Sequence, residues 1–158
     1  MAEPNRAELE GLIDDLRRGY DGEPWHGPSL RKVLEGVTAE AADARPVPGG
    51  HTIRELVAHL AAWDDVVARR IAERRAMEEP DVGDFPAVVG AGPEAWAADF
   101  RELDARHAAL LDVLADLDPA RLPETVAGKD YSIAHMVRGA AQHMAYHAAQ
   151  IGLLKKLM

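Results

Sequence analysis

The sequence predicts an all-α protein, a four-helix bundle, on three observations. Hydrophobic residues make up 47% of the 158 residues, but Ala and Leu supply most of them, and aromatic residues account for only 5%. This composition, in which β-branched runs are scarce, favours packed helices over a sheet. Four long segments repeat apolar residues at helical spacing, and stretches rich in Pro and Gly separate them. The pattern indicates four helices joined by loops.

The first predicted helix begins near Asn5, because Asn5 and Glu8 have the spacing of a capping box. Its apolar stripe predicts one buried face, formed by Leu9, Leu12, Ile13, Leu16 and Tyr20. Many helix-breaking residues follow between positions 22 and 50. This stretch holds one shorter apolar-periodic piece, around residues 30–34.

The second predicted helix begins at Thr52, which forms a T-x-x-E capping box with Glu55. Its inward stripe is Ile53, Leu56, Leu60, Trp63, Val67 and Ile71. Its end is expected to be solvated, because arginines are interleaved there with glutamates: Arg69, Arg70, Arg74 and Arg75 with Glu73, Glu78 and Glu79. The adjacent carboxylates Asp64 and Asp65 point to different faces of this helix and are also expected to be solvated. The segment 77–92 is long for a hairpin, which indicates a crossover between the second and third helices.

Pro93 opens the third predicted helix at its first position, where the missing N–H costs nothing. Its residues alternate by four and three like a bundle seam: Trp96, Phe100, Leu103, His107, Leu110, Leu114 and Leu117. Pro119 and Pro123 end it. The last helix is predicted from Ser132 to the end of the chain, with an inward stripe of Ile133, Met136, Ala140, His143, His147, Ile151 and Leu154.

The composition argues against several classes of partner and metal ligand. The formal net charge is −9, from 27 acidic and 18 basic side chains, and no basic patch is evident. An acidic surface repels phosphate groups, so nucleic acids and anionic membranes are not expected partners. The chain has no cysteine, so any metal site must use His, Asp or Glu. Without a signal peptide or a membrane-spanning run of about 20 apolar residues, a single cytoplasmic domain over residues 1–158 is expected.

His143 and His147 form the strongest candidate site. They are four residues apart, so both imidazoles project from one face of the predicted helix and can reach one ion. Both lie on its apolar stripe, where two unpartnered imidazoles would be costly to bury. The residues alone leave two readings open, a pair of metal ligands or a hydrogen-bonded pair in the core. His59, on the inner edge of the second helix, is either a third ligand or a lone histidine with a backbone partner.

Two segments resemble a known family. "HTIRELVAHLAAWD" (residues 51–64) and "AQHMAYHAAQIGLLKK" (residues 141–156) are similar to the DinB/YfiT-like superfamily of bacterial four-helix-bundle metalloproteins. The resemblance covers essentially the whole chain and implies an up-down-down-up topology with a long crossover between helices two and three. It also implies that one divalent metal ion binds His59, His143 and His147. A homodimer is a further expectation from the family.

The other four histidines are weaker candidates for the metal site. His107 lies on the seam of the third helix, either as a core histidine bonded to a neighbour or as a residue of the metal pocket. His26, in the loop sequence "PWHGPS", either lines that pocket or packs in the loop. His51 and His135 are expected at the surface. Glu55 and Gln150 are candidates to orient metal ligands, although a capping box and a helix–helix hydrogen bond explain them equally well.

Three neutral imidazoles leave a divalent ion its double charge and an open position for water or substrate. Imidazole suits several metals; zinc or nickel is expected first, with iron and manganese as alternatives. The resemblance implies a metal-dependent enzyme, either a hydrolase that activates water or a transferase that activates a low-molecular-weight thiol. The alternative is a non-catalytic metal-binding module that serves in a stress response or sequesters a ligand. The expected partner is a small-molecule substrate.

Overall fold

The computed structural model describes residues 2–158, with side chains from Asn5 onward. Over this range it is all-helical. The four long helices are α1 (Ala2–Tyr20), α4 (Ile53–Glu73), α5 (Gly92–Ala115) and α6 (Ile133–Lys156). The short elements are α2 (Leu30–Leu34), α3 (Ala39–Asp43) and the 3-10 turn η1 (Pro119–Arg121). The described residues form no strand, so the prediction of an all-α protein is confirmed.

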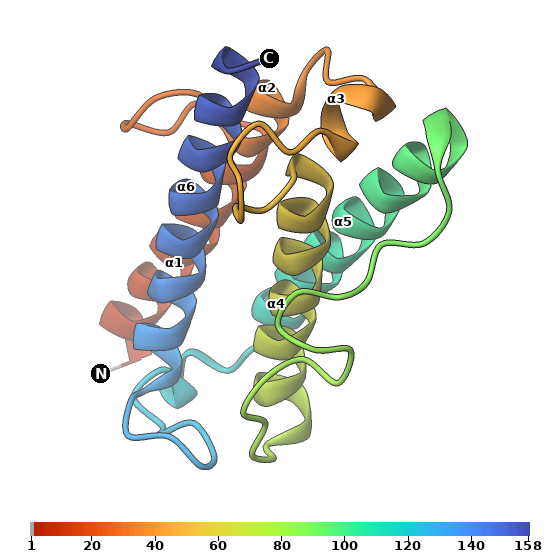
Figure 1. Ribbon diagram of the computed structural model, residues 1–158. Helices are drawn as coiled ribbons and strands as arrows, with labels where there is room; N and C mark the ends of the chain where they lie inside the picture. Colours follow the sequence, from red (N-terminus) through yellow and green to blue (C-terminus); the bar gives the residue numbers. More distant parts are fainter. Residues whose placement is uncertain (1) are drawn as a thin grey trace.

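The long helices pack in contacting pairs. α1 contacts α6, α4 contacts α5, and α4 also contacts α6. In Figure 1, α1 and α6 run from bottom to top, whereas α4 and α5 run from top to bottom. The loop of residues 74–91 therefore returns along the molecule from the end of α4 to the start of α5. The apolar stripes of the four helices meet in one core that includes the fully buried Leu16, Val57, Leu110 and Ile151.

The starts of α4 and α6 agree with the sequence, α5 begins one residue before the predicted Pro93, and the start of α1 differs from the prediction. Thr52 and Glu55 form both bonds of the predicted capping box, and the Ser132 hydroxyl accepts from the backbone N–H of His135. The predicted cap at Asn5 is wrong, because α1 begins at Ala2 and Asn5 lies within it. Pro4 is tolerated in a first turn, so the helix can start ahead of it.

Three side chains of α4 hold the loop of residues 74–91 along that helix. At the loop's start, Arg70 donates to the carbonyl of Met77 (Nε to O, 3.0 Å). At its middle, the Trp63 indole donates to Asp84 Oδ1 (2.7 Å). At its end, Arg54 donates to the carbonyl of Gly90 (2.9 Å). Hydrogen bonds from α4 therefore hold the loop of residues 74–91 along the side of that helix.

Two sequence predictions about charged residues of α4 are wrong. Arg70 was expected at a solvated helix end, and Asp64 was expected to be solvated beside Asp65, but both are buried. Arg70 is covered by the returning loop, whose carbonyls accept its hydrogen bonds. Asp64 faces α5, where it meets His107. Helical periodicity cannot detect either partner, because both come from other parts of the chain.

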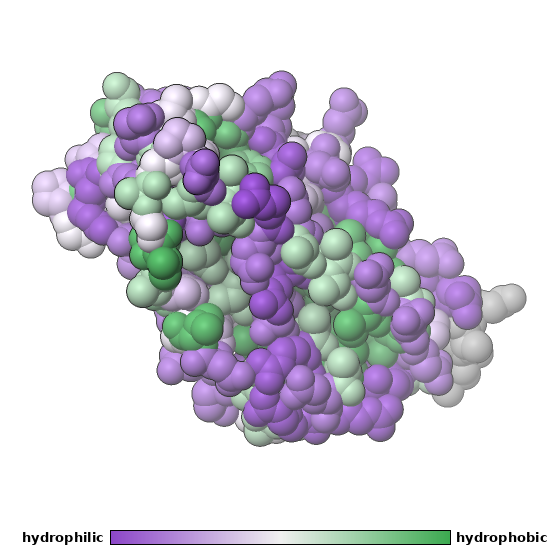
Figure 2. Space-filling model, turned by 90° about the vertical axis from the view of Figure 1, so that its right-hand side faces the viewer, coloured by the Kyte–Doolittle hydropathy of each residue, from purple (hydrophilic) through white to green (hydrophobic). Residues whose placement is uncertain are grey.

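The surface agrees with the acidic, polar composition. The face shown in Figure 2 is mostly hydrophilic, and its hydrophobic patches are separated by polar side chains. None of the helices among the described residues combines the length and apolar character needed to cross a membrane.

Candidate metal centre

The structure brings together the three histidines that the resemblance implies as ligands. His59 comes from α4, and His143 and His147 come from neighbouring turns of α6. The Nε2 atom of His143 lies 2.9 Å from Nε2 of His59 and 3.0 Å from Nε2 of His147. One nitrogen from each residue lies within 4.8 Å of the others. The three residues therefore form a group that could hold a metal ion.

Hydrogen bonds at the Nδ1 atoms of His59 and His147 determine which ring nitrogen carries the proton. His59 Nδ1 is 2.6 Å from the carbonyl oxygen of Asp84, and His147 Nδ1 is 2.6 Å from Oε1 of Gln150. Both partners are acceptors, so each Nδ1 carries the proton and donates it. The Nε2 atom of each neutral ring is then left with a lone pair. Both lone pairs face the centre of the group.

This arrangement fits a cation. His143 Nε2 carries at most one proton, which is too few to satisfy two facing lone pairs at 2.9 and 3.0 Å. A positive ion between the three nitrogens satisfies all of them. Nitrogen ligands around a tetrahedral zinc ion lie about 3.4 Å apart, close to the spacing here. Donation of the second ring N–H to an oxygen is also the usual pattern for metal-binding histidines.

Burial keeps the three imidazoles in the neutral form that binds metal. Loss of hydration is the largest cause that lowers the pKa of His143, and together with the neighbouring charges of His147 and His59 it brings this pKa to about 4. Burial is also the main cause that lowers the pKa of His59 and of His147. All three rings are therefore unprotonated at neutral pH.

We expect metal retention to depend on pH in a defined direction. Protons compete with the ion for imidazole nitrogen, so retention should fall below the ordinary histidine pKa of about 6.5 and be lost near pH 4, where His143 is protonated. Metal analysis after dialysis at a series of pH values measures this. Unchanged retention at pH 4 would instead indicate carboxylate ligands.

The same pKa shifts predict how the metal-free protein responds to acid. Because the folded-state pKa values lie below those of unfolded histidine, the unfolded chain binds more protons between about pH 6.5 and pH 4. Stability is therefore fully present above pH 6.5 and falls as the pH drops through this window. Thermal melts of the metal-free protein across this range give the slope.

The loop adds aromatic contacts that hold His59. Phe85 stacks on the His59 ring, with centroids 4.2 Å apart and planes 13° apart. His51 also stacks on Phe85, with centroids 3.7 Å apart. Sequence reasoning missed Asp84 and Phe85, because they lie in a segment without periodicity. Glu55, considered there as an orienting group, instead serves the capping box and pairs with Arg45.

Gln150 orients His147, which was one of the two roles considered for it. Its amide oxygen accepts from His147 Nδ1 within α6, at three residues' separation. Tyr146 packs edge-on against the same ring, with centroids 5.0 Å apart, and is itself exposed. The ring of His147 is therefore fixed by its own helix, whereas that of His59 is fixed by the loop.

His107 and His26 lie outside the group. His107 is buried, its Nδ1 is 2.9 Å from Asp64 Oδ2, and its ring stacks on Tyr20 at 3.9 Å. This is the core histidine with a neighbouring partner that was one of its two predicted roles. His26 is exposed in the loop after α1 and lines a separate hollow with Arg138. His51 and His135 are exposed, as predicted.

A pocket of about 320 Å³ reaches the metal centre at His143. It lies between α4 and α6, with an apolar lining that includes Trp63, Val67, Met136 and Ala140. Gly139 also lines it, and a Cβ atom added there would meet no other atom within 4 Å. The glycine therefore leaves open space one turn from His143, rather than allowing close approach of a second helix.

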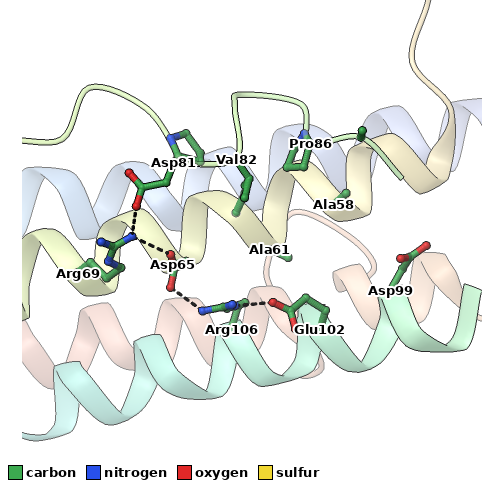
Figure 3. A pocket seen from close by; sticks show the side chains of 13 residues that line it. Ala58, Ala61, Asp65, Arg69, Asp81, Val82, Pro86, Asp99, Glu102 and Arg106 are labelled. Atoms are coloured by element: carbon green, nitrogen blue, oxygen red, sulfur yellow. Dashed lines mark hydrogen bonds and ion pairs between the residues drawn. The ribbon is translucent and has the colours of Figure 1, made fainter. Parts of the chain in front are cut away.

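A larger hollow, of about 800 Å³, lies elsewhere on α4, toward α5 and the loop. Figure 3 shows most of its charged side chains paired with one another; Asp99 has no partner among the lining residues and pairs instead with Arg54. Arg69 lies 2.8 Å from Asp81, and Arg106 lies 2.8 Å from Asp65. These pairs compensate one another, and none of the lining residues is a histidine. The smaller pocket is therefore the one associated with the metal centre.

Comparison with known proteins gives one finding. The chain matches the family model described as the DinB superfamily over residues 25–151. This span includes α4 and α5 whole and most of α6, with all three histidines of the group. Searches of curated proteins and of solved structures gave no match.

Proposed function

This chain belongs to the DinB superfamily, and we propose that it is a metal-dependent enzyme whose single divalent ion is held by His59, His143 and His147. The observation that carries the proposal is the convergence of three Nε2 atoms at the end of a pocket. Two of these atoms have lone pairs fixed by hydrogen bonds on the other side of the ring.

We also infer that the chain is one domain with the up-down-down-up bundle topology of the superfamily. The directions of the four long helices in Figure 1 support this inference. So does the returning loop of residues 74–91, which allows α4 and α5 to run in the same direction. In this topology α4 and α6 are antiparallel neighbours, which lets His59 face His143 and His147.

The chain's own residues would prepare the site in three ways. The Asp84 carbonyl and Gln150 hold two rings in the tautomer that binds metal. Trp63 and Met136 exclude water from part of the pocket wall. His143 is only half-buried, which leaves one side of the group accessible from the pocket. A divalent ion there supplies Lewis acidity, which lowers the pKa of water or of a thiol.

Two reaction classes fit this chemistry: hydrolysis by activated water, and group transfer to an activated low-molecular-weight thiol. We propose a small-molecule substrate for either, because the pocket of about 320 Å³ is at the low end of the range for small-ligand sites. Zinc and nickel are the proposed metals, with iron and manganese as alternatives, because all accept imidazole nitrogen.

Elemental analysis combined with a substrate screen tests the proposal. We expect close to one divalent ion per purified chain, and turnover with a hydrolase or thiol-transfer substrate that disappears on chelation. Bound metal without turnover in either screen would favour a non-catalytic metal-binding module. Absence of metal, even after incubation with zinc or nickel, would contradict both.

A further inference from the structure

Arg70 is a buried cation that forms no hydrogen bond to a carboxylate among the described side chains. The residue is 5% exposed, on α4. Its guanidinium donates to the backbone carbonyls of Met77 and Glu78, to the hydroxyl of Tyr131 and to the thioether of Met136. Each of these acceptors is neutral. Burial of a charge is costly unless an opposite charge or strong hydrogen bonds compensate it.

The two sides of this guanidinium have different environments. Nε and Nη2 face the loop, where they are 3.0 and 3.1 Å from the carbonyl oxygens of Met77 and Glu78. Nη1 has weaker acceptors: the Tyr131 hydroxyl at 3.2 Å and the Met136 sulfur at 4.0 Å. Tyr131 and Met136 both line the pocket that reaches His143. The side that lacks strong acceptors is thus the side at the pocket.

The nearby carboxylates are engaged elsewhere. Glu78 is exposed, and its side chain pairs with Lys129 at 2.6 Å. Lys129 is the main cause that lowers the pKa of Glu78, and the charge of Arg70 is only its smallest contribution. Asp64 lines the same pocket, but its Oδ2 is bonded to His107. Arg70 lies six positions after Asp64, which is about 9 Å along the helix axis. The negative charge of Asp64 opposes any anion at its end of the pocket, so a ligand's carboxylate is expected at the Arg70 end, and a second negative charge is disfavoured.

The position of Arg70 gives an upper limit to the length of a ligand that lies between it and His143. Its Cζ atom is 5.7 Å from the centroid of the Trp63 ring, and that ring is 6.2 Å from the centroid of the His143 ring. These two distances together place the guanidinium within about 12 Å of His143. Apolar side chains, including Val67 and Ala140, line the pocket between them. A molecule with a chain of a few carbon atoms would span this distance.

We propose that the pocket binds a small organic monocarboxylate, with its carboxylate on Nη1 of Arg70 and its apolar body against Trp63 and Val67. The opposite end of the ligand would then lie at His143. Placing the reacting group at that end rests on the proposed function, whereas recognition of the carboxylate by Arg70 does not. The two parts can therefore be tested separately.

The first test uses the metal-free protein at pH 7.5 and two probes of equal size, butyrate and butyramide. Binding is followed by the NMR signal of the Trp63 indole N–H, assigned with a Trp63→Phe variant. We expect butyrate to move this signal saturably and to bind at least about tenfold more tightly than butyramide, because a hydrogen bond to a charged group is stronger than a neutral one. Equal affinities, or no movement with either probe, would overturn the proposal.

Three variants locate the effect. Arg70→Gln should reduce butyrate affinity to that of butyramide, and the adjacent Arg69→Gln should not, because Arg69 pairs with Glu73 and Asp81 away from this pocket. Gly139→Leu should fill the pocket without touching the loop contacts of Arg70, and so abolish butyrate binding. If Gly139→Leu bound butyrate as the wild type does, the pocket would be the wrong site, even if Arg70→Gln failed to fold.

The second test addresses the reacting end with cobalt-loaded protein, 3-mercaptopropionate and 3-mercaptopropionamide. Both thiols should change the cobalt absorption spectrum, the acid at lower concentration than the amide, and Arg70→Gln should remove that difference. A carboxylate preference in the metal-free protein with no spectral change here would retain the anion site, and it would contradict both the placement of the reacting end at the metal and the thiol-transfer form of the proposed function. Spectral changes at equal concentrations of both thiols would count against the anion site.

Discussion

Replacing any one of His59, His143 and His147 with alanine is expected to reduce bound metal from about one ion per chain to a small fraction of that. Each imidazole supplies one of three nitrogens around the ion, and the described cluster contains no fourth residue to compensate. Loss of an outer hydrogen-bond partner alone typically lowers metal affinity by roughly 10–100-fold. Loss of a ligand should therefore cost more than that, and activity should fall with metal content.

Metal analysis of the three purified variants measures this effect, and two other histidines serve as controls. His135 lies on the same helix and lines the same pocket, but is exposed and outside the cluster. His26 is exposed in a separate loop. Alanine at either position should leave the metal content at the wild-type level. If all three cluster variants retained the metal, the assignment of the ligands would be wrong.

The sequence predicts the helices well because their signals are local. Apolar spacing marks the buried stripes, and the Thr52–Glu55 box marks the start of α4 to the residue. His143 and His147 also carry a local signal, since four residues on a helix place two rings on one face. Whether His59 meets these two rings depends on how α4 packs against α6. The sequence pattern alone therefore could not decide between a third metal ligand and a lone histidine with a backbone partner.

The parts that could not be predicted depend on contacts across the chain. Asp84 orients His59 from 25 residues away, in a loop without periodicity. The same loop covers Arg70, although the charged residues beside Arg70 in the sequence indicate a solvated helix end. Asp64 is buried where α5 places His107 against it. In each case the burial follows from packing between segments, which a one-dimensional pattern does not record.

The metal-free wild type and the His147→Ala variant are expected to stay helical and to melt cooperatively. The apolar core extends along all four long helices and includes side chains remote from the histidines, such as Leu16, Leu114 and Leu122. This burial does not require the ion. Small metal-dependent domains behave differently, because their metal-binding free energy is their folding free energy. Added metal should still raise the melting temperature of the wild type by mass action.

A substitution in the apolar core provides a reference for the stability and the metal content of the His147→Ala variant. Leu114 is fully buried in α5, and Leu114→Ala should lower the free energy of unfolding by about 2–5 kcal/mol, the cost of lost burial plus a cavity. It should nevertheless retain the metal, because it leaves the three imidazoles in place.

The His147→Ala variant should show the reverse: the metal is lost, and the thermal melt stays close to that of the metal-free wild type. Far-UV circular dichroism and metal analysis of both variants decide the matter. If His147→Ala and the metal-free wild type both lost their helicity, the ion would be structural and the catalytic proposal would fail, because the core alone would not hold the helices together.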